Sequence, residues 1–90
     1  MNTYTEEEKK LIFDAANQVW AEVASDYLAL SDGKSIPRNE VIEVVSDAGR
    51  MDQILERKGH KDLAKKWGGE DLKSVQKILR PVFPYARYGL

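Results

Sequence analysis

His60 is the only histidine of the chain, and the chain contains no cysteine. A histidine works as a general base when a neighbouring group orients it, and no carboxylate lies at a suitable spacing from His60 in the sequence. Without cysteine there is no thiol nucleophile, no disulfide framework and no thiolate zinc site. We therefore predict a protein that is not an enzyme, with no catalytic residues, no metal site and no cofactor.

Two further patterns could in principle support chemistry. Asp47 with Asp52, and Glu40 with Glu43, are paired carboxylates, but such pairs are expected on the solvated faces of a chain with fifteen acidic residues. The glycine pair at 68–69 precedes an expected helix, as a phosphate-binding loop does, yet it lacks the Lys-Ser/Thr ending and the preceding strand. We interpret these glycines as a turn, and we see no site for a small-molecule substrate.

Charge is divided unevenly along the chain. Residues 1–56 hold five basic against twelve acidic residues, a net charge of −7, whereas residues 57–90 hold nine against three, a net charge of +6. This asymmetry is compatible with an acidic protein partner or with nucleic acid bound to the basic part. It is equally compatible with two faces that attract each other, either within the monomer or across a head-to-tail contact between copies. The sequence pI near 5.8 weighs against nucleic acid, because DNA-binding domains are usually basic overall.

The basic part also resembles a helix-turn-helix. Residues 62–68 are similar to the first helix and turn of that motif, and Val75, Ile78 and Leu79 would form the buried face of its recognition helix. The resemblance implies DNA binding through residues 61–80. The chain departs from the pattern in a turn that is one residue longer and in acidic residues at 70–71, which would meet phosphate with like charge.

Residues 32–41 resemble the second half of an EF-hand calcium loop and the start of its exiting helix. The ligand positions do not fit, because Leu28 and Leu30 would occupy the first and third positions and offer no side-chain oxygen. Glu40 falls one residue late for the closing ligand. We predict no calcium binding.

The elements that must position these residues are helices. Thr5 and Glu8 form a capping pattern, so a helix should begin at Glu6 and continue for about twenty-five residues as the spine of the domain. Its apolar residues recur at spacings of three and four and form a wide stripe, from which we expect the helix to be mostly surrounded. The stripe consists of Ile12, Ala16, Val19, Val23, Tyr27 and Leu30.

Four shorter helices should follow. After a loop at 31–35, the first of these helices has Pro37 in its first turn and ends at Gly49. The other three helices are expected at 51–58, at 61–67 and from 70–71 to Pro81. No stretch alternates with period two. The sequence predicts an all-α fold, with residues 1–90 forming a single compact domain of about five helices, and neither a signal peptide nor a membrane span. We expect a soluble cytoplasmic protein.

The last ten residues, 81–90, form a proline-rich and aromatic tail. Two interpretations stay open: Phe83 and one or both tyrosines fold back to close the core, or the tail is exposed and docks on a partner. We predict a small binding protein that acts through protein–protein interaction, with DNA binding as the alternative. The predicted binding surface comprises Lys65, Lys66, Lys73, Lys77, Arg80, Phe83, Tyr85, Arg87 and Tyr88.

Overall fold

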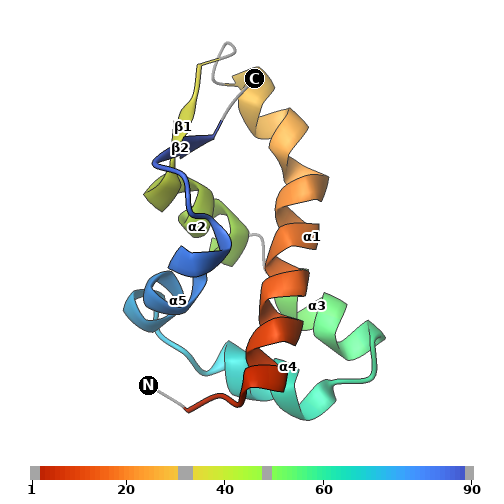
Figure 1. The fold of residues 1–90 in the computed structure, drawn as a ribbon. Coiled ribbons are helices and arrows are strands. Elements are labelled where there is room, and N and C mark those ends of the chain that lie inside the picture. The colour runs from red at the N-terminus through yellow and green to blue at the C-terminus, as the bar shows by residue number, and fades with distance from the viewer. Residues whose placement is uncertain (1–2, 31–33, 48–49, 89–90) are drawn as a thin grey trace.

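The structure, a computed structural model, describes residues 3–30, 34–47 and 50–88. Five helices and a very small sheet follow one another along the chain (Figure 1). The bounds are α1 Glu6–Leu30, β1 Ile36–Pro37, α2 Arg38–Asp47, α3 Arg50–Arg57, α4 Lys61–Gly68, α5 Leu72–Leu79, the 3₁₀ turn η1 Arg80–Val82 and β2 Arg87–Tyr88. The expected all-α architecture with a long first helix is confirmed.

The helix ends follow the local chemistry of the sequence. Thr5 Oγ1 accepts a hydrogen bond from the Glu8 amide at 3.1 Å, and the Thr5 amide donates to Glu8 Oε1 at 2.9 Å, so the predicted capping pattern is formed at both of its hydrogen bonds. Gly59 ends α3 with a φ of +85°. Its amide bonds to the Glu56 carbonyl and the His60 amide bonds to the Leu55 carbonyl, which is the Schellman arrangement.

The other predicted boundaries differ little from the observed ones. Asp71 is the N-cap of α5 and accepts a hydrogen bond from the Ser74 amide at 2.8 Å. Pro37 lies one residue before α2 and pairs with Arg87 in the antiparallel bridge between β1 and β2. Strands of two residues are too short to show alternation of apolar and polar residues, so the sequence pattern did not predict them. The predicted turn at 31–35 lies outside the described residues at positions 31–33, and so does the predicted stop at Gly49.

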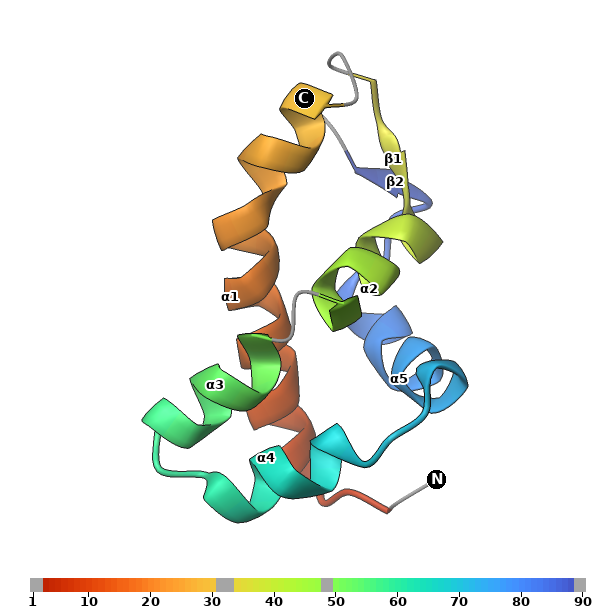
Figure 2. The same cartoon turned by 180° about the vertical axis from the view of Figure 1, so that it is seen from behind.

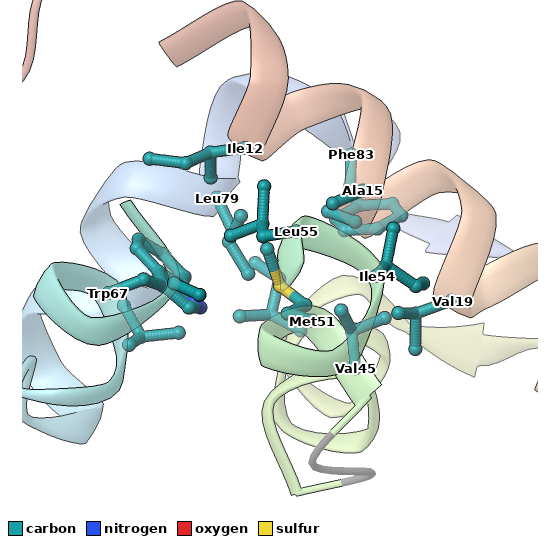
Figure 3. Close-up of a cluster of buried hydrophobic side chains, with 14 of the residues drawn as sticks. Ile12, Ala15, Val19, Val45, Met51, Ile54, Leu55, Trp67, Leu79 and Phe83 are labelled. Atoms are coloured by element: carbon teal, nitrogen blue, oxygen red, sulfur yellow. The ribbon is translucent and has the colours of Figure 1, made fainter. Parts of the chain in front are cut away.

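The core sits where α1, α2, α3, α4 and α5 meet, and it is lined by aliphatic and aromatic side chains (Figure 3). α3 packs between α1 and α4, while α2 packs against α5 and also contacts α1. Figure 2 shows α3 and α4 beside the part of α1 where the helix begins, and the two short strands toward its end. Fully buried members include Ile12, Val19, Ile42, Val45, Ile54, Leu55, Leu79 and Phe83.

The completely buried residues of α1 end at Val19, and Trp20 and Leu28 beyond it are only partly buried against the core. The expectation that α1 is mostly surrounded is therefore wrong. Ile12, Ala15, Ala16 and Val19 are completely buried, whereas Tyr27 is 37% and Leu30 81% exposed. α1 has 25 residues and should span about 37 Å. The four helices that follow have only eight to ten residues each. α3 and α4 lie beside the beginning of α1 (Figure 2), and α2 meets α1 farther along, near Tyr27. None of the described helices is both long enough and apolar enough to cross a bilayer.

Candidate functional site

An open groove of about 400 Å³ lies between the beginning of α1 and the end of α5. One wall comes from the N-terminal segment and the first turns of α1, and the other comes from α5 and the 3₁₀ turn that continues it. We call this feature the basic groove; it is lined by Thr3, Tyr4, Lys9, Phe13, Lys77, Ile78 and Pro81.

Apolar side chains form most of the groove. Phe13 and Ile78 are partly buried side chains that pack against the core from its edge. Lys9 and Phe13 stand four residues apart and therefore share one face of α1, and Lys77, Ile78 and Pro81 close the opposite wall. Such a surface can take an apolar side chain from a partner, because half-covered apolar groups gain from further burial.

The charge of the groove is positive. Its lining contains two lysines and no carboxylate. Lys9 forms an exposed ion pair with Glu6 at 3.5 Å, whereas the exposed Lys77 takes part in no ion pair within the described ranges. Lys73 and Arg80 are also exposed and lie one turn before and one turn after Lys77, so the basic side of α5 continues beyond the groove.

The N-terminal segment is held in place by Tyr4. Its hydroxyl donates a hydrogen bond to Glu70 Oε1 at 2.8 Å, and its ring meets Trp67 edge-on at 6.2 Å between centroids. Lys66 lies 4.4 Å above the Tyr4 ring and donates to the Thr3 carbonyl at 2.5 Å. These contacts span more than sixty residues of sequence and fix one wall of the groove.

Lys66 also binds Glu8, with Nζ 3.4 Å from Oε1. The hydrogen bond from the Thr5 amide, followed by the charge of Lys66, lowers the pKa of Glu8 below its usual value. Lys66 was predicted as part of a binding surface, but the structure places its ammonium against the protein's own N-terminal segment. Lys65, its neighbour, is exposed on α4 and does not line the groove.

The tail confirms the interpretation in which Phe83 and one tyrosine close the core. Phe83 is 2% exposed, so its ring fills the core and does not form part of the protein surface. Tyr88 is partly buried and meets Phe83 at 5.8 Å and Trp20 at 6.4 Å in edge-on contacts. Tyr85 is 68% exposed.

Arg87 is anchored within the protein. Its Nε donates to Ser35 Oγ at 2.7 Å and its guanidinium donates to the Ser35 carbonyl at 2.8 Å. The residues of the predicted binding surface therefore do not form one surface. Of them, Lys77 alone lines the groove, and Lys73 and Arg80 flank it. The other predicted residues either contact the rest of the protein or are exposed outside the groove.

Sequence reasoning missed the apolar part of the groove. Phe13 lies beside the main apolar stripe of α1. Its spacing of four from Lys9 is the sequence feature that could have placed both residues on one face of the helix. Tyr4 precedes the helix, and its contact with Trp67 depends on the packing of α4 against α3. Periodicity within one helix cannot show which residue of another helix stands opposite.

A second, smaller pocket of about 260 Å³ lies among α2, α3, α4 and α5. Asp52 and Glu70 line it beside Trp67, and burial, followed by the nearby charge of Glu56, raises the pKa of Asp52. Across the described ranges, no group of three or more His, Cys, Asp or Glu residues is placed to hold a metal ion. His60 precedes α4 and makes no side-chain capping bond.

No protein-family model, no curated protein and no solved structure matches this chain.

Proposed function

We propose that the protein is a non-catalytic binding module that takes an acidic, partly apolar segment of a protein into the basic groove. The observation that carries this proposal is the lining of the groove, which combines an apolar surface from two helices with two ammonium groups and no carboxylate. An occupant that satisfies both parts needs an apolar anchor and acidic neighbours.

The two parts of the lining have different roles. Burying one apolar anchor side chain contributes roughly 1.5–3 kcal/mol, whereas an exposed ion pair contributes roughly 0.2–1 kcal/mol. The anchor therefore supplies most of the affinity, and Lys9 and Lys77 select acidic over basic partners and speed the encounter. Binding should weaken as salt is added, but only moderately.

DNA binding is the competing function, and the exposed Lys73, Lys77 and Arg80 favour it. A phosphate backbone, however, would gain nothing from the apolar side chains of Phe13 and Ile78, which lie on opposite walls of the groove. The acidic residues at 70–71 also stand at the beginning of α5, where a recognition helix would approach DNA. We therefore favour a protein partner. As a location we propose the cytoplasm, with which the absence of cysteine is compatible.

Fluorescence anisotropy tests the proposal with three labelled helical peptides. All three carry the same leucine stripe, and their remaining positions are glutamate, glutamine or lysine; a labelled DNA duplex is titrated in parallel across salt concentrations. We expect the glutamate peptide to bind about 10-fold more tightly than the glutamine peptide, and the lysine peptide to bind least.

Lys77→Glu should weaken binding of the glutamate peptide about 10-fold, since one favourable contact becomes repulsive. The matched control is Lys61→Glu, which makes the same charge change at an exposed position of α4 outside the groove. Equal binding of all three peptides would overturn the proposal. Steeply salt-dependent duplex binding, weakened by Lys73→Glu and Lys77→Glu alike, would establish the DNA function in its place.

A further inference from the structure

A second surface of this chain has the character that the basic groove requires of its occupant. Along the second half of α1, Tyr27 is 37% and Leu30 81% exposed. Tyr27 also lines a depression of about 210 Å³ between α1 and α2, together with Glu40, Glu43 and Val44. We call the exposed surface formed by Asp26, Tyr27 and Leu30 near the end of α1, together with Glu40 and Glu43 at the edge of this depression, the acidic ridge.

The carboxylates of the ridge are open to solvent. Asp26, Glu40 and Glu43 are exposed, and none of the three forms an ion pair in the part of the chain that the structure describes. Glu22, one turn earlier, is instead paired with Arg50 at 3.1 Å. The last turn of α1 contains no basic residue, and Arg38 is the only basic residue of α2.

The ridge and the groove are complementary in both charge and apolar content. The groove offers Lys9 and Lys77 around Phe13 and Ile78, and the ridge offers carboxylates around Tyr27 and Leu30. Attraction of this kind orients two surfaces and fixes their register, while the apolar groups supply affinity.

A single molecule cannot join its own two surfaces. Phe13 of the groove and Tyr27 of the ridge belong to the same continuous helix, fourteen residues apart, which is a separation of about 21 Å. We propose that the acidic ridge of one copy binds in the basic groove of a second copy, head to tail. This inference rests on the proposed function, because it names the occupant of the same groove.

The contact joins two different surfaces, so each complex leaves one free groove and one free ridge. Association of this type continues into rings or open chains unless one surface is blocked. The mean mass in solution should therefore rise with concentration beyond a dimer, and it should fall as salt screens the lysines and carboxylates.

Sedimentation equilibrium of the full chain tests this at several concentrations and two salt concentrations. The groove variant is Lys77→Glu, and the ridge variant combines Asp26→Asn with Leu30→Ser; all three positions are exposed, so the fold should survive, and circular dichroism checks this. Lys61→Glu is the control for net charge. We expect wild type and Lys61→Glu to associate, and each site variant alone to lose association about 10-fold or more.

Mixing the two site variants gives the decisive result. The groove variant keeps an intact ridge and the ridge variant keeps an intact groove, so the mixture should form a one-to-one complex and stop there. A wild-type chain that stays monomeric at high concentration and low salt would overturn head-to-tail association. So would an associating wild type whose variants fail to complement each other, since another surface would then be responsible.

The peptide titration separates this inference from the proposed function. If the glutamate peptide binds in a manner sensitive to Lys77→Glu while the chain stays monomeric, self-association is overturned and the binding function stands. If the peptide does not bind and the chain is monomeric, both are overturned.

Discussion

The two halves of α1 have similar apolar patterns but different surroundings. Up to the middle of the helix, Ile12, Ala15, Ala16 and Val19 are completely buried in the core. In the second half, Val23 is only partly buried, and Tyr27 and Leu30 are exposed. The apolar spacing of the helix is the same in both halves, so the difference comes from where the shorter helices pack.

The ends of α1 differ in the same sense. The first turn has the capping pair of Thr5 and Glu8 and three acidic residues, which suit the positive end of the helix dipole. The last turn has no basic residue to complement the negative end. The capping interactions thus lie at the beginning of the helix, whereas the exposed apolar side chains, Tyr27 and Leu30, lie near its end.

The largest expected contrast between the halves comes from truncating one apolar residue in each. Ile12→Ala should lower the free energy of unfolding by about 2–5 kcal/mol, because it leaves a cavity in the core, whereas Leu30→Ala should change it by about 0.5 kcal/mol or less. Urea denaturation measures both. Equal losses would show that the second half is covered in solution, and a loss for Leu30→Ala that grows with protein concentration would indicate that another copy covers it.

Removing the cap tests how α1 is anchored at its beginning. Thr5→Ala should lower the free energy of unfolding by about 1 kcal/mol, because the Glu8 amide loses its acceptor. Ser25→Ala is the matched control: Ser25 is exposed in the second half, and alanine is the better helix former there. A Thr5→Ala protein as stable as wild type in urea denaturation would contradict the assigned cap.

Adding a basic residue to the last turn of α1 should reduce the difference between its two ends. Ala29 is exposed in the last turn, and Ala29→Lys should stabilise the protein by about 0.3–1 kcal/mol at low ionic strength through the helix dipole. Ala21→Lys makes the same change at an exposed position in the middle of the helix and should stabilise the protein less, because it is farther from the end of the helix dipole. Thermal unfolding at low and high salt distinguishes the two, because salt screens the dipole effect.

The smallest expected effect is a dependence on pH. The pKa of Glu8 is lowered in the folded state by the Thr5 amide and then by Lys66, so this carboxylate stabilises the fold above its ordinary pKa, and the stabilisation is lost as the pH falls through the folded pKa. Glu8→Gln should therefore flatten the acid side of a stability profile measured by urea denaturation. Glu7→Gln, an exposed change outside the cap, should leave the wild-type slope.

Much of the fold follows from local sequence. The capping pair at Thr5 and Glu8, the stop at Gly59 and the cap at Asp71 are interactions between residues close in sequence, so residue type and spacing predict them. The all-α class follows in the same way from apolar residues recurring at spacings of three and four. The excess of positive charge in residues 57–90 also pointed to α5, one wall of the groove.

What only the tertiary structure decided is which groups are covered and which stand opposite each other. Phe83 and Tyr85 belong to the same short tail, yet one is 2% and the other 68% exposed. Tyr4 reaches Glu70 across sixty-six residues of sequence, and Lys9 faces Lys77 across the groove. The physical reason is that periodicity determines the faces of a single helix, whereas burial depends on how the faces of separate elements fill space together.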